Sequence, residues 1–361
     1  MPLESVSIDV GGQSLTLFLR VEIGAGIKDA CRTFRGTFAD TLGAPQVAPL
    51  FFGGPEIKVY ASGDLMFTGF VDCVTSKVDA QVYGFEISAR AKGQDAVDCS
   101  IDHAKPDYVN RNVLDVAKDQ DRYGIGFSCD CQLDGFDRWR PNPGASLFQS
   151  LQPLCEDEGC TMCGQPDGSI KITRAGESAV PHAGYIAEGR SLPAGLWRGE
   201  ASFDLSAQHS KVTAHGQTFD GTGAQASQIN ASASNSGVTR ARPLVEHHDR
   251  QTSRDRLKKR AGRRRDREQG EGTRACITVR GWRDMGGTLW TPGKTIFVVS
   301  PSLFLAQTLL VETVMFCQAG ERRGGGTETT LHLVDPRAHG GKAGGVDQSG
   351  DAWGFDSSAA S

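Results

Sequence analysis

Five cysteines near the middle of the chain have the spacing most suggestive of chemistry. They stand as Cys129-x-Cys131, Cys155 and Cys160-x-x-Cys163. A Cys-x-x-Cys pair on a hairpin is half of a zinc ribbon, but no second pair of cysteines or histidines follows at the usual interval. The pair also does not open a helix after a strand, as a thioredoxin-like motif does. We therefore expect no metal or cofactor, and two interpretations stay open: structural disulfides among these five residues, or buried free thiols.

Residues that could form a catalytic site are weaker candidates. Cys155 with His182, or the histidines at 247–248 with a carboxylate, lack any nucleophile signature. Glu156 and Glu158 form a close carboxylate pair of the kind that glycoside hydrolysis requires. They end a helical segment before a glycine, so we expect them to face solvent. The sequence thus predicts no catalytic residues, although it leaves a cell-wall-degrading enzyme as the alternative function.

The basic run from Arg250 to Arg267 is the strongest charge feature. Lysines and arginines at helical spacing could follow nucleic-acid phosphates, and a DNA-binding module is a further alternative. Acidic residues such as Asp255 and Asp266 interrupt the run, however, and no aromatic residue offers a stacking surface. Alternating charges are typical of a solvated helix or one at an interface. The candidate interface residues of this helix are Arg254, Arg260, Arg263 and Arg264.

Trp282 and Trp290 flank a short glycine-rich connection, and Pro292-Gly293 follows as an ordinary turn. Two nearby indoles could stack on a sugar or a base. Because the surrounding residues read as strands and turns, we favour a structural role in which both indoles pack at the end of a β domain. The structural residues predicted here are Trp282, Trp290, Pro292 and Gly293.

The composition indicates a multidomain, β-rich protein. The chain has 361 residues with 45 glycines, a hydrophobic share of 38% and a formal net charge of −4. Glycine at this level favours turns and strands over long helices. No segment approaches the length of a membrane span, and the amino terminus lacks the features of a signal peptide. We therefore expect a protein made and kept in the cytoplasm, where disulfides are not favoured until it leaves the cell.

Periodicity divides the chain into three parts and a tail. Residues 1–95 alternate apolar and polar residues, which predicts antiparallel strands closed into a barrel or sandwich. Residues 96–190 are mixed α and β, and residues 191–336 return to strands around a basic helix at 250–268. Strands near 190–220 offered a second way to complete the first domain. The tail, 337–361, is rich in glycine and serine.

Within these parts several elements have specific signals. Asn112 is a plausible N-cap for a helix over 112–118, and a second helix over 147–158 contains Pro153, which should bend or shorten it. A strong turn signal predicts a hairpin over 160–173. Residues 221–237 read as a flexible loop.

From residue 240 to 340 the order of short motifs is specific, and it resembles the Mu-like baseplate hub protein, or tail protein P, of contractile-tail phages. The motifs are Arg242-Pro243, Arg260-Ala261, Val279-Arg280-Gly281-Trp282, Leu289-Trp290-Thr291-Pro292-Gly293, Val299-Ser300-Pro301, Leu309-Leu310-Val311-Glu312, Thr327-Glu328-Thr329-Thr330-Leu331 and Asp335-Pro336.

This resemblance implies the fold class α+β, mainly β, with two tail-tube-like β-barrel domains and a mixed α/β domain between them. It also implies a homotrimer in the virion that joins a hexameric tail tube to a trimeric spike, next to other baseplate proteins. DNA would pass only in transit. We expect the tail, with Trp353 as its single large anchor, to lie against the spike or a neighbouring hub subunit.

Overall fold

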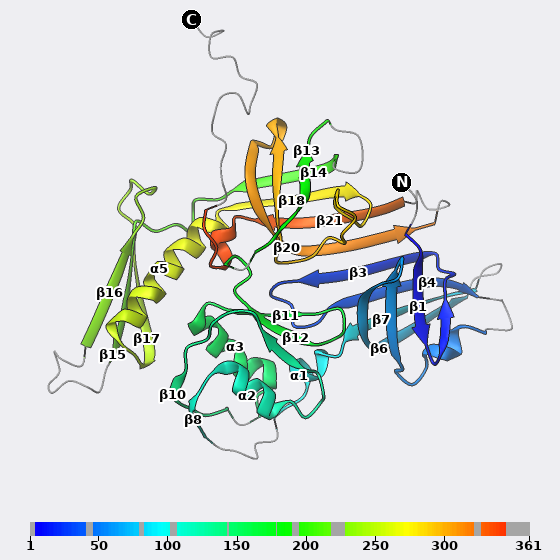
Figure 1. Ribbon diagram of the computed structural model, residues 1–361, viewed down its shortest axis with the longest axis horizontal. Helices are drawn as coiled ribbons and strands as arrows, with labels where there is room; N and C mark the ends of the chain where they lie inside the picture. The colour runs from blue at the N-terminus through cyan, green and yellow to red at the C-terminus, as the bar shows by residue number, and fades with distance from the viewer. Residues whose placement is uncertain are drawn as a thin grey trace, which may run out of the picture.

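Strands dominate the computed structural model, which describes residues 4–40, 46–78, 83–101, 107–142, 144–177, 179–189, 195–217, 228–320 and 326–343. Most of the tail, with Trp353, lies outside the described residues. No helix in these ranges is long and apolar enough to cross a membrane. The expected class, α+β and mainly β, is confirmed (Figure 1).

The N-terminal β unit, residues 4–91, is a run of antiparallel strands, and buried and more exposed side chains alternate along β1, β4, β5 and β7. Phe34, Phe38 and Phe85 point into the core, and the rings of Phe38 and Phe85 stack 4.9 Å apart. Hydrogen bonding orders the strands β3-β4-β7-β6-β5-β1-β2. The elements are β1 (Val6–Val10), β2 (Gln13–Leu15), β3 (Arg20–Gly26), β4 (Thr33–Asp40), η1 (Ala48–Phe51), β5 (Glu56–Ala61), β6 (Asp64–Val78) and β7 (Tyr83–Ala91).

The central domain follows with small helices and sheets around its own core. Asn112 and Asp115 form the reciprocal hydrogen bonds of a capping box, so the predicted N-cap is confirmed. The helix with Pro153 is not shortened, because it continues to Glu158. The predicted hairpin is present as β11 and β12. The elements are α1 (Gln94–Asp98), β8 (Tyr108–Arg111), α2 (Val113–Gln120), β9 (Phe127–Cys129), β10 (Phe136–Trp139), α3 (Leu147–Glu158), β11 (Thr161–Gly164) and β12 (Ile170–Thr173).

The C-terminal β unit is built from two segments, residues 181–203 and 273–334, that flank an inserted arm. Its core joins that of the N-terminal unit in one cluster that includes Trp282 and Phe316. The elements are β13 (Pro181–Ala187), β14 (Leu196–Phe203), β18 (Thr273–Arg280), β19 (Thr295–Ser300), η2 (Pro301–Leu303), β20 (Leu305–Ala319), β21 (Gly326–Val334) and, after it, η4 (Pro336–His339).

The inserted arm consists of β15 (Lys211–Gln217), β16 (Gln228–Ser234), β17 (Pro243–Gln251) and α5 (Arg254–Glu271). It projects to one side of the molecule in Figure 1. Two expectations need correction here. In the predicted loop 221–237, residues 228–234 instead form strand β16, because Ile229, Ala231 and Ala233 alternate toward α5 and their backbone pairs with β15. Residues 221–227 lie outside the described residues. β14 pairs with β18, and β15 pairs with β16 and β17. Neither strand therefore completes the N-terminal unit.

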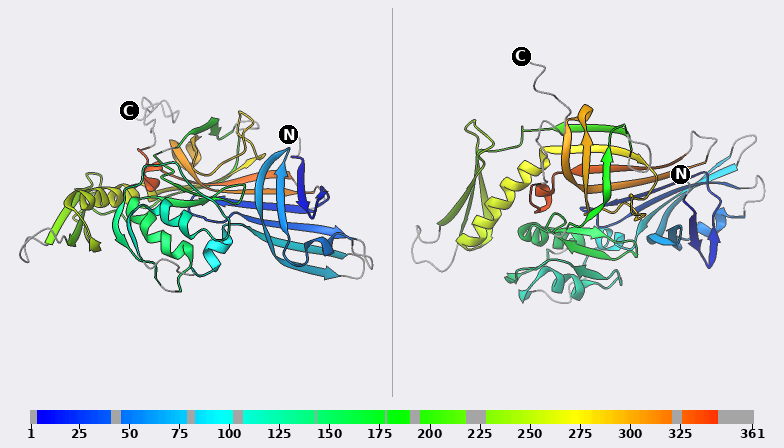
Figure 2. Two further views of the ribbon diagram at one scale, coloured as in Figure 1. Left: turned by 60° about the horizontal axis from the view of Figure 1, so that its bottom comes forward. Right: turned by 45° about the horizontal axis from the view of Figure 1, so that its top comes forward.

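The two β units meet edge to edge. β3 pairs antiparallel with the C-terminal half of β20, from Gly26 opposite Thr313 to Arg20 opposite Ala319. The two strands run side by side through the middle of the molecule in both figures (Figures 1 and 2). The result is a single 13-stranded sheet whose hydrogen bonding stays open among the described residues. The predicted barrels are therefore not confirmed within one chain.

Candidate functional site

Helix α5, which carries the basic run, is positioned by a narrow apolar stripe. Ser253 caps its first turn by accepting a hydrogen bond from the backbone N–H of Arg256. Leu257 and Ala261, four residues apart, are fully buried against Val212 and Ala214 of β15. The other faces of the helix are left to its charged side chains.

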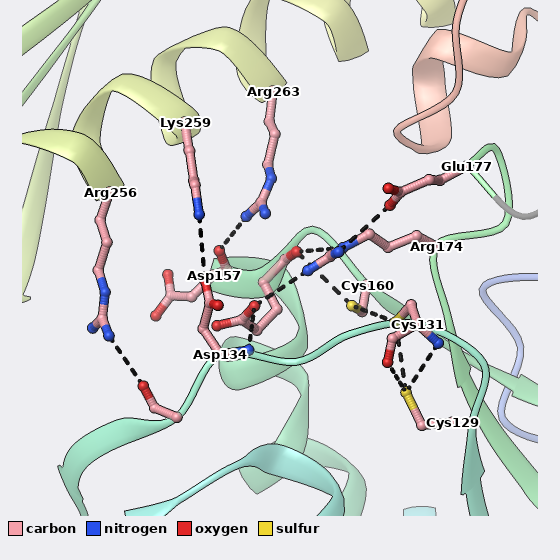
Figure 3. A network of polar contacts seen from close by, with 12 residues as sticks. Cys129, Cys131, Asp134, Asp157, Cys160, Arg174, Glu177, Arg256, Lys259 and Arg263 are labelled. Carbon is pink, nitrogen blue, oxygen red and sulfur yellow. Dashed lines mark hydrogen bonds and ion pairs between the residues drawn. The ribbon is translucent and has the colours of Figure 1, made fainter.

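One charged face of α5 meets the C-terminal end of α3 (Figure 3). Arg260 forms an ion pair with the Asp157 carboxylate at 2.7 Å, and Arg263 donates to the Asp157 carbonyl oxygen at 2.8 Å. Lys259 lies 3.6 Å from Asp134, just before β10. The last carbonyls of a helix lack intrahelical partners and carry partial negative charge, so cations are favoured there. These contacts join the arm to the central domain.

Other charges of α5 are paired within the arm. Arg264 contacts both Glu246 of β17, at 3.3 Å, and Glu268, at 3.0 Å. Glu268 is almost fully buried and also accepts a hydrogen bond from the backbone N–H of His209. Of the candidate interface residues, Arg260, Arg263 and Arg264 thus have partners inside this chain, whereas Arg254 is exposed. Paired arginines of this kind have less freedom to bind DNA phosphates.

Two grooves border the Arg263–Asp157 contact. The first, of about 530 Å³, lies between α5 and the loop around β10, with Trp139 and Arg256 in its walls. The second, of about 900 Å³, lies between α5, α3 and η4. Its walls contain both cations, such as Arg174, and carboxylates, such as Glu177, which pair with each other at 3.4 Å. Neither groove presents a set of charges of one sign.

Trp282 and Trp290 both lie in the core, at 0% and 4% exposure. The Trp282 indole N–H points at the carbonyls of Cys317 and Glu328, 3.2 and 3.1 Å away, so it ties β20 to β21. Pro292-Gly293 forms the turn after Trp290, and Gly293 has the positive φ of +84° that glycine tolerates. Indoles without an exposed face offer no stacking platform to a ligand.

All ten cysteines are free thiols in the structure. The sulfurs of Cys129 and Cys160 each lie 3.5 Å from that of Cys131 (Figure 3). Cys155 and Cys163 are buried in the central domain. Burial raises the pKa of the Cys131 and Cys160 thiols to about 11, so both are protonated near neutral pH. The predicted disulfides remain a prediction. No group of three or more potential metal ligands in the described ranges is arranged to hold an ion.

The side chains considered for catalysis lie in separate parts of the structure. Cys155 belongs to the central core, while His182 is buried in the C-terminal unit against Asp284, with Nδ1 2.9 Å from the carboxylate. Glu158 accepts a hydrogen bond from Arg174, and Glu156 accepts one from Gln152. His182, Glu158 and Glu156 thus have structural partners, and Cys155 and His182 lie in different parts of the chain.

Sequence reasoning missed a junction centred on Glu312. This carboxylate, at the bulge of β20, lies 3.0 Å from Lys28, 3.1 Å from His339 and 3.3 Å from Arg274. It therefore links the turn after β3 to η4 and β18. Burial raises the pKa of Glu312, but the hydrogen bonds from His339 and Lys28 outweigh it and lower the pKa to about 2. The only signal in the sequence was an acidic residue inside an apolar strand.

Sequence reasoning also missed the free edges of the large sheet. β14 pairs only with β18, and the residues of β6 after its bulge pair only with β7 among the described strands. Trp197 and Phe203 on β14 are half exposed, and Val78 at the end of β6 is 73% exposed. Large apolar side chains on an unpaired strand edge are a surface that proteins usually cover. The signal available in the sequence was the presence of two aromatic residues, Trp197 and Phe203, in an otherwise largely polar strand.

Comparison with known proteins agrees with this architecture. Residues 251–340 match the family described as Mu phage baseplate assembly protein GpP, fourth domain. The baseplate hub protein gp44 of Escherichia phage Mu is 22% identical over an alignment of 277 residues, which covers 72% of this chain and 70% of the phage protein.

Two solved structures share the fold over nearly their whole length. The 43 kDa tail protein of prophage MuSo2 from Shewanella oneidensis has a TM-score of 0.78 and 22% identity, covering 93% of this chain and 99% of its own. A tail protein from Neisseria meningitidis has a TM-score of 0.77 and 20% identity, with the same coverage. The family match over 251–340, the phage relative and the shared fold agree, and together they confirm the resemblance of this chain to Mu-like baseplate hub proteins of phage tails.

Proposed function

We propose that the protein is the hub of a contractile-tail baseplate and acts as a trimer. It joins a tail tube of six-fold symmetry to a spike of three-fold symmetry and leaves a channel through which DNA passes. Its work is then geometric, with no chemical step, and other baseplate proteins attach around it.

The observation that carries this proposal is a repeat of strand topology inside the chain. In the N-terminal unit β3 pairs with β4, β4 with β7, β7 with β6, β6 with β5 and β5 with β1. In the C-terminal unit β14 pairs with β18, β18 with β21, β21 with β20, β20 with β19 and β19 with β13. The two sets appear in the same order along the sequence. One orientation differs, since β1–β5 is antiparallel and β13–β19 is parallel.

The longest strand of each unit makes the repeat sharper. β6 and β20 both have 15 residues, and each pairs with one neighbour only before a bulge and with a second neighbour across and after the bulge. The bulges fall between Val71 and Cys73 and between Val311 and Thr313. Matching bulges at matching positions support two copies of one structural unit, because bulges are specific features of a fold.

Two similar units per chain explain how one protein meets two symmetries. Three copies present six similar units, which suits a tube with six subunits per ring. The units are not identical, so the ring keeps true three-fold symmetry, which suits a trimeric spike. Closed symmetric rings of this kind are the usual form of protein oligomers.

The face of the sheet away from the core suits a water-filled channel. Alternation places charged and hydroxyl side chains there, including Arg35 paired with Glu86 at 2.6 Å and Arg20 paired with Glu22 at 2.5 Å. Balanced charges neither trap nor repel a polyanion strongly, because attraction to phosphates scales with the number of unpaired cations. A channel through which DNA passes requires walls that neither bind nor repel the DNA strongly.

The test is the mass and symmetry of the full-length chain. Sedimentation equilibrium over a wide concentration range, followed by electron microscopy, should give three times 38.6 kDa and a ring with a central opening. Tail particles should contain half as many hub chains as there are tube subunits in one ring. A monomer in solution together with any other ratio in particles would overturn the proposal.

A further inference from the structure

Three cysteine sulfurs of the central domain lie in contact, one after another (Figure 3). Cys131 Sγ is the middle one, 3.5 Å from the sulfurs of both Cys129 and Cys160. The sulfurs of a disulfide are about 2.05 Å apart, a distance that side-chain rotation can reach from such a contact. The row therefore offers two possible disulfides, Cys129–Cys131 and Cys131–Cys160.

The backbone around Cys129 disfavours the first of these bonds. Asp130 is fixed over the end of β12, because its N–H donates to the Ile172 carbonyl at 3.3 Å and its carboxylate accepts from Thr173 at 3.0 Å. The Cys129 thiol donates to the Cys131 carbonyl at 3.1 Å and accepts from the Cys131 N–H. A disulfide across one residue would remove that thiol donor and close a small ring around a backbone that is already held in place.

We propose that Cys131 and Cys160 are a site of oxidative modification, at which a disulfide joins the exit of β9 to the entry of β11. Cys129 ends β9, and Cys160 directly precedes β11. The two strands flank β12, and each pairs with β12 rather than with the other. The bond would thus connect two ends of the small sheet that the strand pairing leaves unconnected, and Cys129 would stay a thiol beside it.

The reaction requires an oxidant, and a small disulfide such as oxidised glutathione supplies one. Cys131 is partly exposed, whereas Cys160 is 4% exposed, so the Cys131 thiolate attacks first. A mixed disulfide forms, and one glutathione leaves as the thiol. Cys160 then loses its proton and attacks Cys131 Sγ, which releases the second glutathione. The two cysteines lose two electrons and two protons, and the small disulfide gains both.

Arg174 provides a cation beside the two thiols. Its Nε–H donates to the Glu158 carbonyl at 3.1 Å, and the Cys160 thiol contacts the same carbonyl at 3.8 Å. Burial raises the pKa of the Cys131 and Cys160 thiols to about 11, and the positive charge of Arg174 opposes that rise. Few thiolates exist near neutral pH, so the reaction is slow and depends on the oxidant that surrounds the protein.

The two cysteines belong to the two segments that receive helix α5. Cys131 stands three residues before Asp134, and Cys160 stands three residues after Asp157. Cations of α5 contact both carboxylates, as described above. The Asp134 N–H also donates to the Glu158 carboxylate at 3.3 Å, so the segments already touch. A covalent bond would fix their separation, and α5 would then dock on a more rigid surface.

The surroundings decide when the bond forms. Disulfides are disfavoured where a cell keeps thiols reduced, and they persist outside it. A tail particle that is assembled in a cell and then released meets these conditions in that order, so the chain would assemble reduced and oxidise afterwards. This timing rests on the proposed function, whereas the pairing of Cys131 with Cys160 does not.

Peptide mapping of the full-length chain tests the pairing. The reduced protein is incubated with oxidised glutathione at mildly alkaline pH, alkylated, digested and analysed by mass spectrometry without reduction. Peptides joined through Cys131 and Cys160 should be the main disulfide product, with Cys129 recovered alkylated. Cys160→Ser should abolish this product. Cys276→Ser is the matched control, because it removes a partly buried cysteine of the C-terminal unit, and it should leave the product unchanged.

Hydrogen exchange gives a second readout. Oxidation should slow amide exchange over residues 129–136 and 157–160 by about tenfold or more, because the disulfide limits the freedom of the locally opened state. A reductant should reverse the change. Cys129→Ser keeps both proposed cysteines and should respond as the native chain does, whereas Cys160→Ser should not respond. Circular dichroism of the reduced variants checks that each one is folded.

The outcomes separate this inference from the proposed function. A main product that joins Cys129 to Cys131, or three alkylated thiols after long exposure to the oxidant, overturns the pairing while the hub stands. Slower exchange that requires Cys129 instead of Cys160 overturns it as well. In tail particles alkylated on isolation, the bond should be present after release and absent from particles taken from inside cells, and the reverse order overturns the timing. A chain that forms the bond but never a trimer overturns the proposed function and keeps the pairing.

Discussion

Replacement of Glu312 by glutamine should make the protein less stable at neutral pH. Glutamine keeps the shape of the side chain but removes the charge that Lys28, Arg274 and His339 surround. The pKa of Glu312 is lowered from 4.5 to about 2. One pKa unit corresponds to about 1.4 kcal/mol, which gives roughly 3 kcal/mol in favour of the ionised form. Since solvent reaches Lys28 and Arg274, we expect about 2 kcal/mol.

The sign of the pH dependence follows from the direction of the shift. A carboxyl group whose pKa is lower in the folded than in the unfolded state stabilises the protein above its unfolded pKa of 4.5. That stability is lost as the pH falls from about 4.5 to about 2. The difference between the native chain and Glu312→Gln should therefore be largest near neutral pH and shrink to about 1 kcal/mol at about pH 3.5.

Urea unfolding followed by far-ultraviolet circular dichroism measures both quantities, at one protein concentration because assembly also stabilises the fold. Glu86→Gln is the matched control. Glu86 pairs with Arg35 on the open face of the sheet, where an ion pair contributes about 0.5 kcal/mol or less. The reasoning is refuted if Glu312→Gln matches the native chain within about 0.5 kcal/mol at neutral pH, or if the difference grows as the pH falls.

Two further predictions concern the core and the arm. Trp282→Phe should lower the free energy of unfolding by about 2 kcal/mol or more, because the smaller ring leaves a cavity and lacks the N–H that donates to two strand carbonyls. Urea unfolding measures this loss, and an unchanged midpoint would contradict the packing described. Arg263→Gln should weaken the contact between α5 and α3 by about 1 kcal/mol, seen as faster amide hydrogen exchange over 254–271. Lys258→Gln, on the exposed side of α5, should change nothing, and equal effects of the two variants would show that the contact at Asp157 does not hold the arm.

Local elements were predictable because their signals are local. The N-cap at Asn112 and the hairpin over 160–173 each depend on residues that are close together in the sequence. The order of motifs from 240 to 340 was sufficient to recognise the family. The strand β16 was missed because its alternating residues are alanine and one isoleucine, which carry little hydrophobic signal in a stretch of serine and asparagine.

The internal repeat could not be found from the sequence, although a trace of it remains there. When β6 and β20 are aligned on their bulges, the residues identical between them are Leu65 and Leu305, Thr68 and Thr308, Val71 and Val311, and Val74 and Val314. Four apolar or small residues in one strand are common in any buried strand. Only the pairing order of all the strands shows that the two units are copies.

The sequence by itself determined the helix cap at Asn112, the hairpin turn, the mainly β class and the resemblance to Mu-like baseplate hub proteins. The tertiary structure alone decided which strands pair, where α5 docks and which edges stay open. Strand pairing uses backbone N–H and C=O groups, which nearly every residue carries, so the sequence of β3 does not specify β20 as its partner. The choice of partner depends on the packing of side chains that are far apart in the chain. The same packing leaves β14 and the end of β6 as unpaired edges among the described strands.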